Sequence, residues 1–273
     1  MKRGITAFGL EPTDLVTSIE VAGAAGYEAV ELRTYMVASF LAQGHTVKEL
    51  VDKLESLSIW PNLIGAVLDI EMPAGPERDE LIADFRRSCE VMREIGCPGI
   101  QVCSGNRLSR LDWPSIRKQT AKGLQGLADV AAEYDLKVVY EPLAWMPACN
   151  TAKVVEVIEE AERENVQVLV DSFQIFAGED DLETIRNLDP KIIGSVHLGD
   201  TGPKELDIWA DDDRYTMPGD GIVPLKETMR AILDTGYDGV ITDEIYAAKY
   251  TSWSRLRLAE TLKAKADSVL ARL

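Results

Sequence analysis

The chain has 273 residues, of which 46% are hydrophobic and 27% are charged, and its formal net charge is −17 at pH 7. This excess of acid disfavours nucleic acid and anionic membranes as partners, because both carry negative charge. The apolar run at the N-terminus is too short for a secretion signal, and no run approaches the roughly 18 apolar residues of a membrane span. Four cysteines without a CxxC pair complete the prediction of a cytoplasmic protein with free thiols.

Short runs rich in Val, Ile and Leu alternate with longer stretches whose apolar residues recur at three- and four-residue spacing. The short runs predict eight strands, in chain order Gly4–Gly9, Ala29–Arg33, Pro61–Ala66, Gly99–Ser104, Lys137–Pro142, Gln167–Ser172, Ile192–Leu198 and Gly239–Ile245. The longer stretches predict helices at Asp14–Ala25, Thr46–Leu57, Glu77–Ile95, Ser115–Tyr134, Ala152–Asn165, Leu182–Leu188, Leu225–Thr235 and Ser252–Leu270.

This alternation predicts the fold. Eight β–α units in a chain of this length match a single (β/α)8 TIM barrel, an α/β fold, and we expect one domain over residues 1–273. The competing fold is an open, doubly wound sheet. It is disfavoured because the first turn, AFGLEPTD, lacks the GxGxxG pattern.

The last four predicted strands each end in a side chain that can bind a metal ion. In chain order these are Glu141 in KVVYEPL, Asp171 in VQVLVDS, His197 in IIGSVHL and Glu244 in GVITDEI. Taken alone, such a carboxylate is usually a cap or turn residue, and such a histidine is usually a hydrogen-bonded core residue. Because TIM-barrel active sites lie at the carboxyl ends of the strands, four in succession predict one shared site.

A divalent cation explains this clustering. Three buried carboxylates in one barrel mouth would repel one another, and an isolated buried charge is costly unless it is paired or bound to a metal. Three carboxylates and one imidazole suit Mn²⁺, which we expect, and also Mg²⁺, Co²⁺ or Zn²⁺. His45 is the second of only two histidines, so a histidine-rich zinc cluster is excluded. His45 precedes a predicted helix and is expected to be exposed or capping.

The carboxyl-terminal half resembles a known family. The ligand residues, HLGD at 197–200, RYTMPGDGIVPL at 214–225 and GYDGVITDEIY at 236–246 are similar to the xylose isomerase-like TIM-barrel superfamily, the sugar phosphate isomerase/epimerase group. That group includes ketose 3-epimerases, inosose isomerases and dehydratases, hydroxypyruvate isomerase, dehydroshikimate dehydratase and endonuclease IV. Its metal ligands are Glu, Asp, His and Glu on strands five to eight, which the resemblance carries over to Glu141, Asp171, His197 and Glu244.

The resemblance also implies an activity. It suggests a metal-dependent isomerase or epimerase of a keto-sugar, inosose or related hydroxy-ketone, acting through an enediolate held by the metal. Glu141 and Glu244 would serve as its acid and base. The alternative is a lyase on the same scaffold, which would dehydrate a dehydroshikimate-like or inosose substrate or cleave a 3-keto-glycoside by elimination. A homo-oligomer or association with a partner subunit is compatible with the resemblance.

Two other readings are weaker. An endonuclease IV-like repair enzyme would need several more histidines and a less acidic surface, and the intact ligand set argues against a noncatalytic scaffold.

Many members of the family carry D-x-x-H on strand six, whereas this chain has DSFQ. Gln174 stands in place of the histidine and cannot shuttle a proton there.

Further residues are candidates for contact with the carbohydrate-like substrate. Arg214 would bind a substrate oxygen or, alternatively, neutralise the neighbouring aspartates 211–213, and Asp200 would hold a ligand or merely end its strand. The PGDG sequence at 218–221 predicts a turn. The candidate substrate-binding residues are Phe8, Tyr35, Trp145, Gln174 and Arg214.

Overall fold

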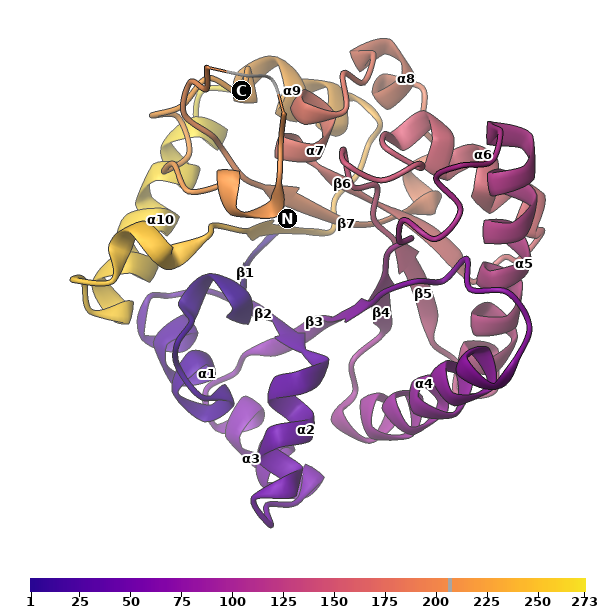
Figure 1. Ribbon diagram of the computed structural model, residues 1–273. Helices are drawn as coiled ribbons and strands as arrows, with labels where there is room; N and C mark the ends of the chain where they lie inside the picture. The colour runs from indigo at the N-terminus through magenta and orange to yellow at the C-terminus, as the bar shows by residue number, and fades with distance from the viewer. Residues whose placement is uncertain (206–207) are drawn as a thin grey trace.

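The eight apolar runs form eight parallel strands that close into a barrel in chain order, with β1 paired to both β2 and β8 (Figure 1). The computed structural model describes residues 1–205 and 208–273. The strands are β1 Lys2–Thr6, β2 Ala29–Arg33, β3 Trp60–Val67, β4 Gly99–Val102, β5 Lys137–Tyr140, β6 Val166–Asp171, β7 Ile193–Leu198 and β8 Val240–Asp243. The predicted (β/α)8 barrel is therefore confirmed.

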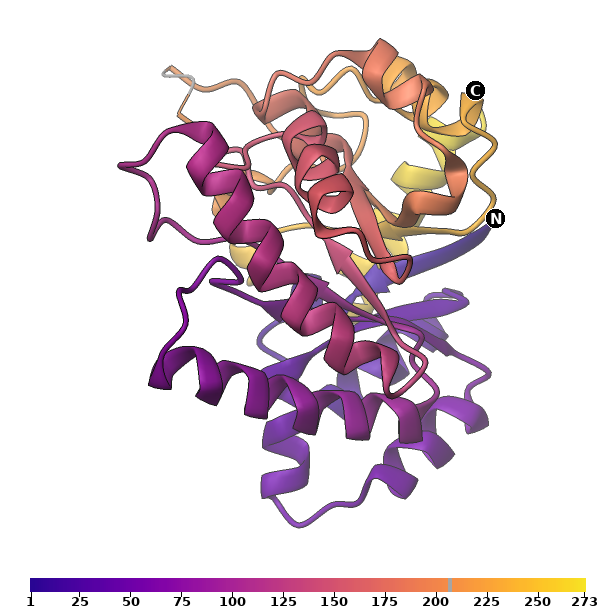
Figure 2. The same ribbon diagram turned by 90° about the vertical axis from the view of Figure 1, so that its right-hand side faces the viewer.

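Helices surround the barrel, and Figure 2 shows α4 and α5 as long neighbouring rods along its outside. The α-helices are α1 Leu15–Ala24, α2 Thr34–Ala42, α3 Val47–Ser56, α4 Pro76–Ile95, α5 Trp113–Ala132, α6 Thr151–Ala161, α7 Ser172–Ala177, α8 Leu182–Arg186, α9 Leu225–Asp234 and α10 Arg255–Leu270. Short 3-10 helices are η1 Ala7–Leu10, η2 Pro190–Ile192, η3 Asp211–Asp213 and η4 Ala247–Tyr250. None of the described helices is long and apolar enough to cross a membrane.

Local signals explain where several helices begin and end. The Asp14 side chain accepts the N–H of Thr17 at the start of α1, and Thr46 and Glu49 form a reciprocal capping box at the start of α3. Helix α4 ends at Gly96, whose φ of 78° is the left-handed conformation that glycine adopts readily.

Two helices were not predicted. Helix α2 follows β2 directly, and its first residue is preceded by Arg33, whose side chain makes no cap hydrogen bond. Its sequence TYMVASFLA is also apolar around most of its circumference, so it carries neither a start signal nor a clear helical period. Helix α7 is only six residues long, and it begins where Asp171 accepts the backbone N–H groups of Phe173 and Gln174.

The first strand is shorter than predicted. It was expected to reach Gly9, but it ends at Thr6, whose hydroxyl oxygen accepts the N–H of Gly9 at 3.2 Å and starts η1. Strands β4, β5 and β8 likewise end two residues before the predicted positions, and β6 ends one residue before. In β5 and β8 the regular strand therefore ends directly before a predicted ligand, Glu141 or Glu244.

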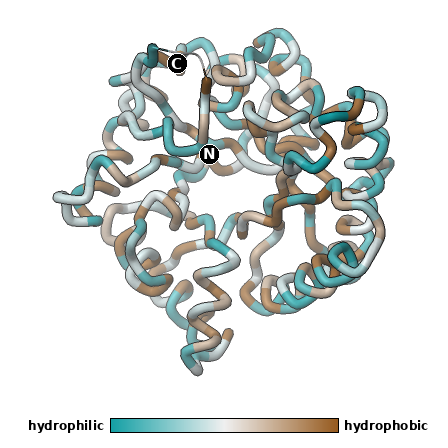
Figure 3. The backbone as a smooth tube through the Cα atoms, viewed as in Figure 1, coloured by the Kyte–Doolittle hydropathy of each residue, from teal (hydrophilic) through white to brown (hydrophobic). Residues whose placement is uncertain are grey.

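The core lies mainly between the strands and the helices, and a small second cluster of Leu63, Val139 and Leu169 is separate from it. Val139 and Leu169 lie two residues before Glu141 and Asp171, so the alternation of side chains places them on the same face of the sheet, one layer lower. In Figure 3 the strands are mostly hydrophobic, whereas hydrophobic and hydrophilic residues alternate along the helices. The cluster forms an apolar layer beneath the polar mouth of the barrel.

All four cysteines are free, as expected.

Candidate metal centre

The sheet brings the four predicted ligand residues together. Asp171 and His197 are register partners at the ends of β6 and β7, so their side chains emerge side by side. Glu141 and Glu244 each follow the last residue of a strand. Their backbone N–H groups still donate to the neighbouring strands, to Val102 O at 3.0 Å and Leu198 O at 3.2 Å. The ladder thus fixes the backbone from which both glutamates project.

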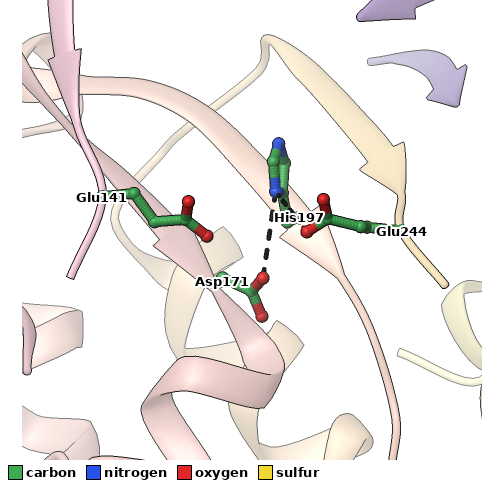
Figure 4. Close-up of side chains that lie close together, drawn as sticks. All are labelled: Glu141, Asp171, His197 and Glu244. Carbon is green, nitrogen blue, oxygen red and sulfur yellow. Dashed lines mark hydrogen bonds and ion pairs between the residues drawn. The ribbon is translucent and has the colours of Figure 1, made fainter. Parts of the chain in front are cut away.

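One ligand atom from each of the four side chains lies within 4.8 Å of all the others, and all four residues are buried. Figure 4 shows Glu141 and Glu244 on opposite sides of the cluster, with Asp171 and His197 between them. Nδ1 of His197 lies 3.0 Å from Glu244 Oε2 and 3.8 Å from Asp171 Oδ2. Nδ1 is therefore the imidazole nitrogen that faces the carboxylates.

The other imidazole nitrogen contacts a carboxylate that sequence reasoning missed. Nε2 of His197 lies 2.7 Å from Oε2 of Glu31, a fully buried residue on β2. An imidazole that binds a cation through Nδ1 carries a proton on Nε2, and Glu31 accepts that hydrogen bond. The signal in the sequence is VELR at 30–33, but Glu31 lies inside the apolar run and not at its end, where the predicted ligands lie.

A second missed feature connects the two glutamates. Arg33, at the end of β2, donates through Nη2 to Glu244 Oε1 at 2.9 Å and through Nη1 to Gln101 Oε1 at 3.0 Å. Gln101, on β4, donates in turn to Glu141 Oε2. Gly65 leaves room for this bridge, because a Cβ there would lie 1.8 Å from Gln101 Oε1. Glu141 and Glu244 are thus held by one continuous chain of hydrogen bonds.

Arg214 is buried against the ligand set. Its Nη1 lies 3.0 Å from Asp171 Oδ2 and also contacts Glu244, while its Nη2 contacts Asp211. Of the two alternatives predicted for Arg214, the aspartate contact is present with Asp211, but the side chain is not a solvated loop arginine. It supplies positive charge to two of the predicted metal ligands.

Burial and neighbouring charges separate the proton affinities of the two glutamates. Burial, together with the charge of Glu244, raises the pKa of Glu141 to about 8. Burial acts the same way on Glu244, but Arg214, His197 and Arg33 outweigh it and lower its pKa. Burial opposes a charge on His197, yet the carboxylates of Glu31 and Glu244 raise its pKa well above the usual value.

The residues present fit a divalent cation. Glu141 Oε1 is buried and has no hydrogen-bond partner among the described residues, a state that is costly unless a ligand satisfies the oxygen. It belongs to a set of three carboxylates and one imidazole, the mixture of hard oxygen and nitrogen donors that Mn²⁺, Mg²⁺, Co²⁺ and Zn²⁺ accept.

A cavity of about 450 Å³ opens beside this cluster. Its lining includes Glu141, Glu244 and two of the predicted substrate-binding residues, Trp145 and Arg214. It also includes Cys103, whose thiol points toward Glu141 Oε2 at 3.7 Å. This cavity is the space in which a small substrate would meet the ligand set.

The other three predicted substrate-binding residues are not part of that cavity's lining in the described structure. The guanidinium of Arg33 lies over the ring of Phe8, with its Cζ atom 5.0 Å from the ring centroid. Gln174 is buried, and its Oε1 accepts the backbone N–H of Ala144 at 2.9 Å, so it anchors the loop after β5. Tyr35 is the second residue of α2 and lines a neighbouring groove.

Asp200 holds a loop instead of a ligand. Its carboxylate accepts the N–H groups of Gly219, Gly221 and Val223 at 2.9 to 3.1 Å, which fixes the predicted PGDG turn. The Gly221 position must remain open, because a Cβ there would lie 2.2 Å from Asp200 Oδ1. His45 is exposed, as expected, and stacks on Phe40 with ring centroids 4.4 Å apart.

Comparisons with known proteins agree with this architecture. A family model described as the xylose isomerase-like TIM barrel matches residues 19–268. An inosose isomerase of Bacillus velezensis is 23% identical over 266 residues, 96% of this chain and 94% of that protein. A 3-dehydroshikimate dehydratase of Pseudomonas putida is 27% identical over 252 residues, 90% of this chain but 38% of that longer protein.

A solved structure has the same fold. It is described as the crystal structure of IOLI protein with a binding zinc atom, and it superimposes with a TM-score of 0.93 at 22% identity. The match covers 100% of this chain and 99% of that one.

Proposed function

Because the chain belongs to the xylose isomerase-like TIM-barrel family, we propose that it is a divalent-metal-dependent isomerase or epimerase of a keto-sugar, inosose or related hydroxy-ketone. The observation that carries the proposal is the buried cluster of Glu141, Asp171, His197 and Glu244 beside a cavity of about 450 Å³. The relative named inosose isomerase, which matches along nearly its whole length, supports the same substrate class.

The four clustered residues would hold the ion, and we propose Mn²⁺. When bound, such an ion polarises a substrate carbonyl and stabilises the negative charge that develops on its oxygen. The zinc atom named for the structural relative supports the binding of a divalent ion by this protein.

Glu141 and Glu244 would carry out the proton transfers. One removes a proton from the carbon next to the carbonyl, and the other returns a proton to the opposite face or to the adjacent carbon. Their placement on opposite sides of the cluster suits this division, and the Arg33–Gln101 bridge holds both carboxylates in position. Trp145 and Arg214, which line the cavity, would position the substrate.

A lyase is the second candidate. The relative named 3-dehydroshikimate dehydratase favours it, although this chain spans only 38% of that protein. The first step would be the same proton removal. If the substrate carries a leaving group β to the resulting carbanion, its departure gives elimination, of water or of the aglycone of a 3-keto-glycoside, in place of reprotonation.

The test is incubation of the manganese-loaded protein with inososes and ketoses in D₂O, followed by NMR and mass spectrometry. Solvent deuterium in a recovered sugar or its isomer supports the isomerase, and loss of water or of an aglycone supports the lyase. Glu141→Gln and Glu244→Gln should each lower kcat at least about 100-fold with an unchanged circular dichroism spectrum. The exposed control Glu164→Gln should keep full activity. Full activity in both glutamate variants would refute the assigned roles.

A further inference from the structure

We propose that the catalytic cavity continues into an apolar groove between α2 and α4, and that this groove binds a neutral, apolar substituent of the substrate. The inference rests on the proposed function, because it extends the substrate of that same site. It specifies a keto-sugar or cyclitol that carries an aromatic or aliphatic group, in place of a free sugar.

The groove is larger than the catalytic cavity, with a volume of about 940 Å³. Its apolar lining comes from one side of α2, from the end of β3 and from α4, which lie on the same side of the barrel (Figure 1). Among the lining residues, Tyr35 is 52% exposed and Leu68 is 56% exposed. Large apolar side chains gathered in a surface concavity are typical of a binding site.

The groove adjoins the catalytic cavity. Both are lined by Ala66 and Leu68, which flank the last residue of β3. Two further segments pass from one space to the other within a single residue. Arg33 lines the cavity and the next residue, Thr34, lines the groove. In the same way, Asn106 lines the cavity and Arg107 lines the groove. A substituent leaving the cavity over Leu68 would therefore enter the groove directly.

The charges around the groove indicate a neutral occupant. Its lining contains two arginines, and both are already paired with carboxylates. Arg107 lies 3.1 Å from Glu77, and Arg87 contacts Asp84. A phosphate or carboxylate on the substrate would meet arginines that are already neutralised, and also the carboxylate of Glu80. An apolar group would instead cover the exposed apolar side chains of the groove.

The experiment compares phenyl β-D-glucopyranoside with methyl β-D-glucopyranoside, which lack a keto group and so are not turned over. Binding to the metal-loaded protein is measured by calorimetry. We expect the phenyl compound to bind about 10-fold more tightly, the gain typical of burying one small apolar group. Ala38→Trp, which fills the groove from the exposed side of α2, should abolish this preference and leave binding of the methyl compound unchanged. Ser39→Trp, at the next exposed position and outside the groove lining, is the matched control and should keep the preference.

Equal binding of the two glucosides by the unmodified protein, including no binding of either, would overturn the assignment, as would a phenyl preference that survives Ala38→Trp. Light scattering adds another refuting outcome. If the protein is a dimer that only Ala38→Trp dissociates, a second copy covers the groove. Deuterium exchange into an unsubstituted inosose tests the proposed function separately, so either idea can fail while the other stands.

Discussion

The contact between Glu31 and His197 gives the sharpest quantitative prediction, because Glu31 touches the predicted ligand set through His197 alone. We expect Glu31→Leu, which removes the acceptor at similar volume, to weaken Mn²⁺ binding about 10- to 100-fold. The structure supports this magnitude. The bond is 2.7 Å long between two fully buried groups, and a buried hydrogen bond to a charged group contributes about 1.5–3 kcal/mol. That free energy corresponds to a factor of roughly 10 to 150. Glu31→Gln retains an acceptor oxygen and should lose less.

The assay is calorimetric titration of the metal-free protein, with Glu28→Gln as a control that removes an exposed carboxylate just before the same strand. A second readout separates positioning from general destabilisation. The chain has only two histidines, so the imidazole ¹⁵N spectrum of the zinc-loaded protein contains two rings, one of them the exposed His45. In the unmodified protein Nε2 of His197 should carry the proton, and in Glu31→Leu that signal should broaden or shift. Unchanged affinity and an unchanged His197 signal in Glu31→Leu would refute the positioning role.

Three further predictions follow from close contacts and from the ligand set. Removing the metal with a chelator should lower the melting temperature measured by calorimetry. Adding the metal back at 100 times its Kd should restore about 2.7 kcal/mol of stability. If the added metal does not shift the melting temperature, binding to the folded state is excluded. Gly65→Ala should lower kcat about 10- to 100-fold because its Cβ would displace Gln101, and unaltered kinetics would show that the bridge does not position the glutamates. Gly123→Ala would place a Cβ 1.7 Å from the Ile70 carbonyl oxygen and should lower the free energy of unfolding by about 1–3 kcal/mol in urea, whereas Gly126→Ala on the same helix should cost less.

The sequence was sufficient to predict the barrel and the residues that converge in its mouth. Parallel strands that are buried on both faces have continuous apolar sequences, so they can be recognised. Because the strands are parallel, their last residues all lie at one end of the barrel. Asp171 and His197 could be placed side by side on that argument alone. Helix α2 could not be predicted, because its hydrophobicity lacks a helical period and no cap residue precedes it.

The partners of the ligands were harder to predict for a different reason. Glu31 and Gln101 each occupy a strand interior whose pattern is as apolar as its neighbours, and their significance appears only when the barrel closes and brings distant strands together. Gln174 shows the opposite case. Its position in DSFQ suggested a substrate contact, but the six-residue helix α7 turns its amide toward the backbone of Ala144. Local sequence does not reveal such a turn of one short helix.

The Arg33–Gln101 bridge also bears on how this barrel could be divided. The predicted ligands all come from β5 to β8, whereas the groups that orient them, Glu31, Arg33 and Gln101, come from β2 and β4. A cut between β4 and β5 would therefore separate Glu141, His197 and Glu244 from these groups, while Asp171 would keep Arg214, and neither half-barrel would contain a complete site. Circular permutation, by contrast, keeps all eight strands in one closed ring. Tight metal binding in this protein would then report that the two halves have joined, so metal affinity could serve as a direct probe of barrel closure during assembly from fragments.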